Sequence, residues 1–189
     1  MSRVIGVIAE DMSDVEVIKI LLKKTSAKKF STAQFVGKGC GPLKKKIPGW
    51  CKAFKQKGVH AVLVVHDLDK NDQDQLQQKL AALLPANMFA TATVVIPIEE
   101  LEAWLLSDEI AIQKALKLQD TPKPVHHPET IESPKEHLGT LVKQYSKGGL
   151  KQYVNTVHNA QIAQNMSIAK LSKCKSFTAF SAFAKVAIG

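Results

Sequence analysis

The stretch Ala61-Val-Leu-Val-Val-His-Asp-Leu-Asp69 decides the fold of this 189-residue chain. Five apolar residues, most of them β-branched, lead to a histidine and then to two aspartates separated by one residue. A short apolar run of this kind is typical of a buried strand in a parallel sheet. Asp67 and Asp69 would then lie at the carboxyl end of the strand, the edge at which open α/β sheets bind their ligands.

Two carboxylates at such an edge, with no arginine beside them, are costly unless a cation meets them. A hard divalent metal ion is the natural partner of these oxygen ligands. The alternative is that residues 69–74 form only a solvated loop and the cap of the next helix.

Composition fits one α/β domain with a core of its own, because 45% of the residues are hydrophobic. Cys40, Cys51 and Cys174 follow no zinc or disulfide spacing, so we expect reduced thiols. The first apolar stretch is too short for a signal peptide, and no later run approaches the length of a membrane span. We therefore expect a soluble, cytoplasmic protein with no membrane partner.

The charges are segregated along the chain. Twelve lysines and no acidic residue lie between Glu16 and Asp67, and seven lysines and no acidic residue follow Glu136. The seventeen carboxylates fall in four clusters, within residues 10–16, 67–74, 99–109 and 120–136. This pattern predicts a basic surface for a polyanion, such as nucleic acid, around an acidic centre for a metal ion. A generically basic protein without a polyanionic partner is the alternative.

The N-terminal segment predicts a second set of carboxylates at the same edge. Residues 3–9 form an apolar run typical of a buried strand, and Ser13 with Glu16 predicts a capping box for the helix that follows. Glu10 then stands at the strand end and Asp14 in the first helical turn, where it could also serve only the helix dipole.

A basic segment follows the predicted strand over residues 31–36. We expect a helix over residues 42–57, interrupted near Pro48. Its neighbouring lysines could follow a phosphate backbone without reading base sequence: Lys38, Lys44, Lys45 and Lys46.

The fourth predicted strand, over residues 91–98, is preceded by a predicted helix and followed by acidic residues. Asp72 with Gln75 predicts the start of the preceding helix, which should run to Leu84. Glu99-Glu-Leu-Glu102 begins the next helix, so Glu100 and Glu102 should border the acidic edge, although a first-turn glutamate can also serve only the dipole.

The remainder, residues 119–189, is predicted to be a long loop and a helical extension that packs on an α/β core of residues 1–118. His126 and His127 lie in the loop, and adjacent histidines on extended backbone point opposite ways, so we expect both to be exposed. Phe177, Phe180 and Phe183 should face the core. The expected fold is thus a Rossmann-like, mostly parallel four-stranded sheet flanked by helices, with a C-terminal helical extension.

These motifs carry a resemblance to a known family. A strand, Glu10-x-x-x-Asp14, a helix and a later strand ending in Asp67-x-Asp69 resemble the Toprim domain of topoisomerases, primases and OLD-family nucleases. Five stretches, spread over most of the chain, are also similar to a poorly characterised bacterial Toprim-like family. They are Glu10-Asp-Met-Ser-Asp-Val, His66-Asp-Leu-Asp, Pro97-Ile-Glu-Glu-Leu-Glu-Ala-Trp-Leu-Leu, Pro134-Lys-Glu and Ser176-Phe.

The resemblance implies a site for Mg or Mn. Glu10 matches the glutamate that acts as acid, base or ligand, and Asp67 and Asp69 match the metal-holding pair. Asp14 matches the added aspartate of the OLD-like variant, in which glycine usually follows the glutamate, whereas Asp11 stands here. With Glu100 and Glu102 these residues form our predicted metal site, and we add Lys135 to the predicted nucleic-acid contacts.

The sequence therefore predicts a metal-dependent nuclease or related phosphodiester-cleaving enzyme acting on DNA or RNA, with a place in genome defence or repair. Carboxylate-held cations neutralise the transferring phosphoryl group and activate water. Tyr145 and Tyr153 lie in the late helical part, so we expect no tyrosine nucleophile of the topoisomerase kind. OLD nucleases carry an ATPase module that this sequence lacks, so we expect a partner protein to supply ATPase or targeting function.

Two other classes remain open. One is a non-catalytic component that binds nucleic acid or a partner protein, with an acidic cluster that is vestigial or binds metal structurally. The other is a receiver-like phosphoacceptor with Asp67 phosphorylated. A receiver also needs Ser or Thr after the next strand and Lys after a fifth, and Pro97-Ile-Glu-Glu does not supply the first of these.

Overall fold

The computed structural model describes residues 3–37, 39–147, 149 and 152–189. Its centre is a four-stranded parallel sheet with the strand order β2-β1-β3-β4. The strands are β1 (Arg3–Ala9), β2 (Phe30–Val36), β3 (Ala61–Val65) and β4 (Thr91–Val95). The predicted fold class and strands are thus confirmed, except that β4 stops before Pro97, which has no N–H to donate to a ladder.

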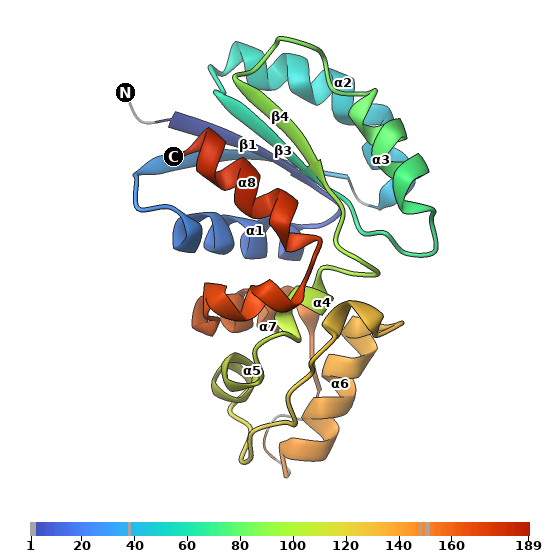
Figure 1. The fold of residues 1–189 in the computed structure, drawn as a ribbon, viewed down its shortest axis with the longest axis vertical. Helices are drawn as coiled ribbons and strands as arrows, with labels where there is room; N and C mark the ends of the chain where they lie inside the picture. The colour runs from blue at the N-terminus through green and yellow to red at the C-terminus, as the bar shows by residue number, and fades with distance from the viewer. Residues whose placement is uncertain (1–2, 38, 148, 150–151) are drawn as a thin grey trace.

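Helices cover both faces of the sheet (Figure 1). On one face lie α1 (Met12–Thr25) and α8 (Phe177–Ala187), and on the other lie α2 (Cys40–Gln56) and α3 (Gln73–Ala81). The sequence of β3 is apolar throughout because side chains on both of its faces are buried. Leu63 belongs to the first hydrophobic cluster, and its neighbours Val62 and Val64 belong to the second.

A group of helices gathers beside this layered core, below the sheet in Figure 1. It contains α4 (Glu102–Leu105), α5 (Glu109–Leu116), α6 (Pro134–Tyr145) and α7 (Asn155–Asn165). The loop before α6 includes the 3-10 turn η1 (Pro128–Thr130), and the 3-10 helix η2 (Ile168–Lys173) leads into α8. No helix in the described part of the chain is both long and apolar enough to cross a bilayer.

Trp104 of α4 joins the helical group to the core. It is fully buried, its ring meets the edges of Phe177 and Phe180 at centroid distances of 5.2 and 5.6 Å, and its indole N–H donates to Ser176 Oγ at 2.8 Å. Phe183 is buried in the same cluster. The predicted core role of the three C-terminal phenylalanines is confirmed.

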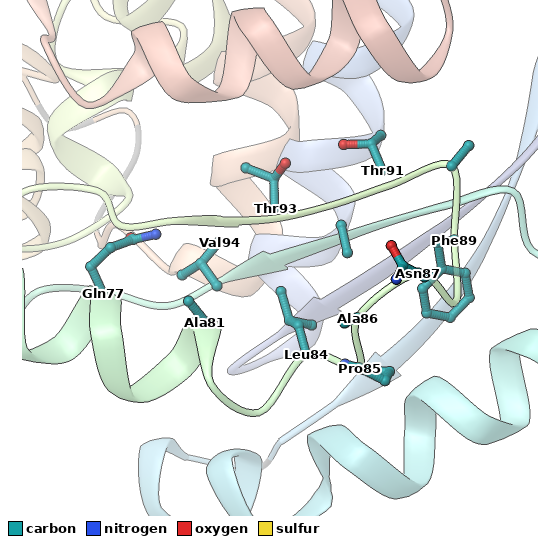
Figure 2. A pocket seen from close by; sticks show the side chains of 12 residues that line it. Gln77, Ala81, Leu84, Pro85, Ala86, Asn87, Phe89, Thr91, Thr93 and Val94 are labelled. Carbon is teal, nitrogen blue, oxygen red and sulfur yellow. The ribbon is translucent and has the colours of Figure 1, made fainter.

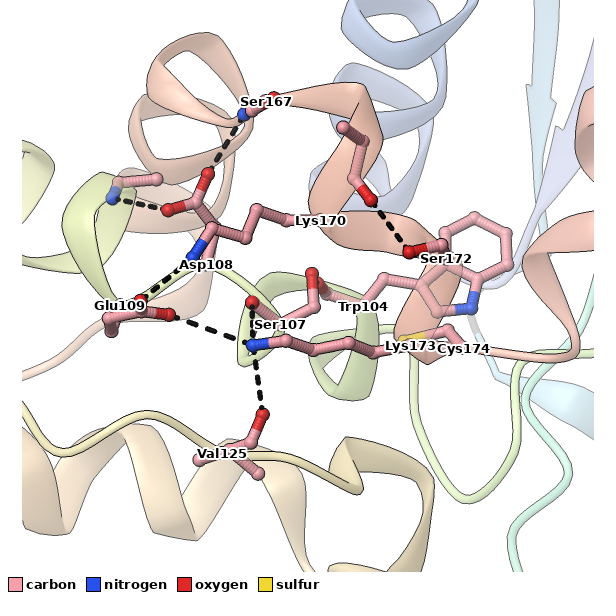
Figure 3. Close-up of polar contacts among 12 residues, drawn as sticks. Trp104, Ser107, Asp108, Glu109, Val125, Ser167, Lys170, Ser172, Lys173 and Cys174 are labelled. Carbon is pink, nitrogen blue, oxygen red and sulfur yellow. Dashed lines mark hydrogen bonds and ion pairs between the residues drawn. The ribbon is translucent and has the colours of Figure 1, made fainter.

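Polar contacts of Lys173 and Asp108 hold η2 against α5 and the long loop that follows α5 (Figure 3). Lys173 Nζ donates to the carbonyl oxygens of Ser107 and Val125 at 2.8 and 3.1 Å. Asp108 caps α5 through the Ala111 N–H at 3.1 Å and also accepts the Ser167 N–H at 2.8 Å. These contacts use backbone carbonyls and N–H groups, which explains how a long loop can pack closely without losing hydrogen bonds.

The predicted start of α1 was wrong. Asp11, and not Ser13, is the N-cap, and its carboxylate accepts the N–H groups of Ser13 and Asp14 at 2.7 and 3.1 Å. Asp14 closes the capping box by accepting the Asp11 N–H at 3.2 Å, while Glu16 pairs with Lys19 at 2.9 Å. Aspartate is as good an N-cap as serine, and the strand end places Asp11 in the extended conformation that a cap needs.

Two other helix predictions also need correction. Helix α2 runs without interruption through Pro48, which is exposed, so the carbonyl that loses its helical donor can face water. Helix α3 begins at the predicted Asp72 cap but ends at Ala81, and tighter turns carry the chain to Leu84.

Gly6 marks a close approach between β1 and α2. A methyl group at this position would lie 2.8 Å from two ring carbons of Phe54 and 3.1 Å from Val59 Cγ1. We expect Gly6→Ala to lower the free energy of unfolding by about 1–3 kcal/mol, because the buried ring cannot retreat without displacing its neighbours. Chemical denaturation measures the change.

Gly49→Ala is the matched control, because nothing beyond its neighbours in the chain and the backbone of its own helix lies within 4 Å of the added methyl group, and alanine favours the helix. It should leave stability unchanged or raised. Equal stabilities for the parent and the Gly6 variant would contradict the packing described here.

Candidate active site

The sheet reverses its winding between β1 and β3. The chain leaves β1 for β2 at one edge, returns to β3 and continues to β4 at the other edge. The carboxyl ends of two neighbouring strands thus open a crevice whose connecting helices leave to opposite faces, the usual ligand position in such sheets. Glu10 follows β1 and Asp67 follows β3 at this point, and the Asp67 N–H donates to Glu10 Oε1 at 3.3 Å.

Asp67 is the central carboxyl group of the site. Its Oδ1 accepts the N–H of Leu101 at 2.9 Å, which ties the end of β3 to the segment that begins α4. Burial raises the pKa of Asp67 well above its ordinary value, and the nearby charges of Asp14, Glu102, Glu10 and Asp69 raise it further. Carboxyl groups from several separate elements thus lie near enough to Asp67 to act on its pKa.

Asp14 and Glu102 are the two most enclosed acids of the group, with 7% and 4% of their surfaces exposed. Burial raises the pKa of Asp14 to about 8, and the charges of Asp11 and Glu102 add to the shift. Burial also raises the pKa of Glu102, partly offset by a hydrogen bond from Asn159. Of the two glutamates predicted near α4, Glu102 is the one that reaches the centre.

Glu10 is held by a histidine that sequence reasoning did not single out. His66 is buried, and its Nδ1 lies 3.2 Å from Glu10 Oε1 and 2.6 Å from the carbonyl oxygen of Asp67. A carbonyl oxygen only accepts, so Nδ1 carries the proton. Burial raises the pKa of Glu10, His66 opposes the shift, and Asp69 adds to it. The signal for His66 was its place directly before Asp67 at a strand end.

Asp69 lies at the exposed rim of the site. Its backbone has a φ of +48°, and its N–H donates to the carbonyl oxygen of Glu99, itself at a φ of +58°, at 3.0 Å. The loops after β3 and β4 thus stay paired beyond the strands. A cavity of about 470 Å³ opens here, with Asp69, Glu99 and Glu100 among its walls.

Glu100 lies at the rim of the site and also accepts a hydrogen bond from the neighbouring helix α6. Its Oε2 accepts the N–H of Lys135 in the first turn of α6 at 2.8 Å, and it lines a larger cavity of about 790 Å³ between α6 and residues 152–155. The structure therefore places Glu100 between two cavities, next to the buried centre rather than inside it.

The predicted lysines divide into two groups. Lys44 and Lys135 lie close enough to the acids that their charges lower the pKa values of Glu10 and Glu102, respectively. Lys45 and Lys46 are exposed on α2, where Lys46 Nζ lies 5.7 Å from the centre of the Trp50 ring. Lys38 lies outside the described residues.

The donor set fits a hard divalent cation in chemistry, because it consists of desolvated carboxylates that raise one another's pKa values. From the described residues, Asp67 receives a hydrogen bond only on Oδ1 and Asp14 only on Oδ2, so one oxygen of each is free for a ligand. In the present rotamers, however, no three His, Cys, Asp or Glu side chains of the described residues stand close enough to share one ion.

Two further residues of the site had no signal in the sequence. Asn159 of α7 donates to Glu102 Oε1 at 3.0 Å, and Tyr153 donates its hydroxyl to Asn159 Oδ1. From the sequence we expected only that Tyr153 is no nucleophile of the topoisomerase kind, and its contact with Asn159 was not predicted. Neither residue belongs to a motif. The packing of α7 beside α4 brings Asn159 to a glutamate 57 residues away, and Tyr153 in turn contacts Asn159.

Other features of the chain do not contribute to this site. His126 and His127 are both exposed, as predicted. A cavity of about 470 Å³ beside α3 and the edge strand β4 has walls such as Leu84, Phe89 and Thr91 (Figure 2). Every residue that lines it is uncharged, so it lacks groups for acid–base or metal chemistry.

Fold and site together define a parallel α/β protein with an acidic centre at the point where the sheet reverses. The chain belongs to the family described as a domain of unknown function, DUF4276, which matches residues 9–183. Comparisons with curated proteins and with solved structures give no significant match. The family description names no activity, so the resemblance to Toprim domains stays a prediction.

The raised pKa of Asp14 predicts a pH dependence of stability in EDTA. The folded protein keeps the Asp14 proton up to about pH 8, whereas the unfolded chain releases it near the ordinary pKa of 3.8. The stabilisation from this proton is complete below the unfolded pKa and is lost as the pH rises through the folded one. We expect the stability of the parent, relative to Asp14→Asn, to fall between about pH 5 and about pH 8.

Denaturant titrations across this range measure the effect. Glu16→Gln removes a surface carboxylate from the same helix. Its free energy of unfolding should vary with pH in the same way as that of the parent. A constant difference between the parent and Asp14→Asn at all pH values would contradict the assignment.

Proposed function

We propose that this protein is a metal-dependent nuclease, or a related phosphodiester-cleaving enzyme, that acts on DNA or RNA with Mg or Mn. One observation carries the proposal. Carboxyl groups from β1, α1, β3 and α4 converge where the sheet reverses, and burial together with mutual repulsion raises their pKa values. A fold gains nothing in stability from such crowding, whereas a bound cation would neutralise it.

In this proposal the position of each acid determines its role. Asp67 and Asp69 on the β3 side and Glu10 on the β1 side would hold the cation, with Asp14 and Glu102 enclosing it from α1 and α4. When bound, such a cation neutralises charge on the phosphoryl group and lowers the pKa of water. Glu10 has a raised pKa and a fixed neighbour in His66, so it is suited to accept the proton of an attacking water at a carboxylate oxygen.

Substrate binding would follow the lysines. Lys44 on α2 and Lys135 on α6 bring positive charge next to the acids, and further exposed lysines continue along α2: Lys45, Lys46, Lys52 and Lys55. Contacts of this kind hold phosphates and read no bases. The proposal places the enzyme in the cytoplasm, with a partner protein for ATPase or targeting function, as the Toprim resemblance implies.

A second candidate is a non-catalytic component that binds nucleic acid. It is favoured by the side-chain positions, because no three acids of the described residues share one ligand shell as they stand. Such a protein would bind nucleic acid through the same lysines and would not cleave it, whether its acids are vestigial or bind a metal ion structurally.

Asp67→Asn and Asp69→Asn separate the two candidates. Each removes a charge and keeps the shape, and asparagine accepts the left-handed backbone at residue 69. In EDTA we expect both variants to be as stable as the parent or slightly more so, because repulsion is relieved. With Mg or Mn the parent alone should melt higher, by the equivalent of roughly 2.7 kcal/mol at about 100 times the Kd.

Labelled DNA and RNA, with Mg, Mn or EDTA, measure cleavage in parallel. Both variants should lose it, and Asp74→Asn, an exposed carboxylate on α3, should keep both cleavage and the metal response. Variants that melt several degrees lower in EDTA would make these aspartates structural, and parental cleavage rates in the variants would end the nuclease proposal.

The basic face of α2 predicts steep salt dependence of nucleic-acid binding. Each lysine that contacts a phosphate contributes roughly 0.9 to the slope of log K against log salt on duplex DNA. We expect Lys45→Gln combined with Lys46→Gln to reduce that slope by roughly 1–2. Fluorescence anisotropy across a salt series measures it.

Lys114→Gln combined with Lys123→Gln is the control, since it removes the same charge from α5 and the loop after it, where both lysines are exposed. Affinity that does not depend on salt would instead favour a protein partner.

A further inference from the structure

The segment from Tyr153 to Asn159 connects the two elements that bring the most enclosed acids to the site. Helix α7 packs against both α1, which carries Asp14, and α4, which carries Glu102. On the α1 side, Asn155 Nδ2 donates to Ser13 Oγ at 3.4 Å, and Ser13 Oγ donates to Asp11 Oδ1 at 2.7 Å. On the α4 side, Asn159 reaches Glu102 directly.

The contacts of Asn159 form a directed chain of hydrogen bonds. Its Nδ2 donates to Glu102 Oε1 at 3.0 Å, and its Oδ1 accepts the hydroxyl of Tyr153. Asn159 is fully buried and Tyr153 is 8% exposed, so water does not compete for these groups. The Tyr153 ring is itself fixed by stacking on His158 at a centroid distance of 5.9 Å.

The direction of this chain follows from the groups that form it. Burial raises the pKa of Tyr153, so its hydroxyl keeps a proton and can donate. An amide that accepts this proton on oxygen must turn its NH2 group toward the glutamate. The opposite orientation would place the amide oxygen against a carboxylate oxygen, which is repulsive.

We propose that Tyr153 and Asn159 are positioning residues, which fix the orientation of the Glu102 carboxylate in the acidic centre and so set the affinity of the site for a divalent cation. The inference rests on the proposed function, because it takes Glu102 as part of a cation site. Partners behind a ligating group commonly determine its orientation, and their loss weakens metal binding about 10- to 100-fold.

Tyr153→Phe is the sharpest test, because it removes one hydroxyl and keeps the stacked ring. The chain has two tyrosines, so Tyr145→Phe, on α6 and outside the chain of bonds, is the matched control. Isothermal titration with Mn measures affinity without reference to cleavage. We expect about tenfold weaker Mn binding for Tyr153→Phe and parental binding for Tyr145→Phe. The unpaired Asn159 oxygen should lower the melting temperature of Tyr153→Phe in EDTA, so the titrations are run at a temperature at which both variants are fully folded.

A double-mutant cycle shows whether Tyr153 and Asn159 act through one continuous series of hydrogen bonds or through two independent structural effects. Asn159→Leu removes the amide at similar volume, and Tyr153→Phe should then weaken Mn binding no further, because the bond that the hydroxyl supports is already gone. Additive losses would overturn the inference. If Asn159→Leu fails to fold, the comparison of Tyr153→Phe with Tyr145→Phe still decides the outcome.

The possible results also separate this inference from the proposed function. Mn binding by the parent, with Tyr153→Phe indistinguishable from Tyr145→Phe, overturns the positioning role and leaves the metal site standing. A parent protein that shows neither heat of Mn binding nor a rise in melting temperature overturns both.

Discussion

The parallel pairing of β1 with β3 is the interaction on which the rest of this structure depends. Its register, which runs from Ile5 opposite Ala61 to Ile8 opposite Val64, brings the two strand ends together. Glu10 and Asp67 then meet closely enough for the Asp67 N–H to donate to Glu10 Oε1. Because the strand order reverses here, the helices that follow β1 and β3 leave to opposite faces of the sheet. Asp14 and Asp69 follow this pair closely along the chain, and Glu102 is added by the packing of α4.

The crowding of these acids is organised by one hydrogen bond for each enclosed carboxylate. Leu101 donates to Asp67, Asp11 to Asp14 and Asn159 to Glu102. Each bond fixes an oxygen, and each donor belongs to the backbone or to a buried amide, so none brings a compensating charge. The arrangement holds its shape while the repulsion remains, a conflict between stability and local order that is typical of functional sites.

The sequence was informative where a single strand or a single turn sets the outcome. The apolar run of β3 predicts burial on both faces, and its aspartates predict a place at the carboxyl edge, because both follow from strand geometry alone. At the start of α1 either Asp11 or Ser13 could have been the N-cap, and the extended backbone after β1 gives this position to Asp11. Glu100 and Glu102 could not be told apart, since the choice depends on α6, whose first turn uses Glu100 as a hydrogen-bond acceptor. Tyr153 and Asn159 depend on tertiary packing in the same way.

In the proposed function, the segregation of charge along the chain would couple the binding of a cation to the binding of nucleic acid. A polyanion is attracted by the lysines of α2 but repelled by the acids beside Lys44, and the nearer a phosphate comes to Glu10 and Asp67 the stronger this repulsion grows. A cation among the acids reverses the sign of the local field and leaves the lysines unchanged. Nucleic acid should therefore raise the affinity for the cation by the same factor as the cation raises the affinity for nucleic acid, since linkage between two sites is reciprocal. On this proposal, a basic helix next to an acidic centre would favour binding of both ligands together over binding of either alone.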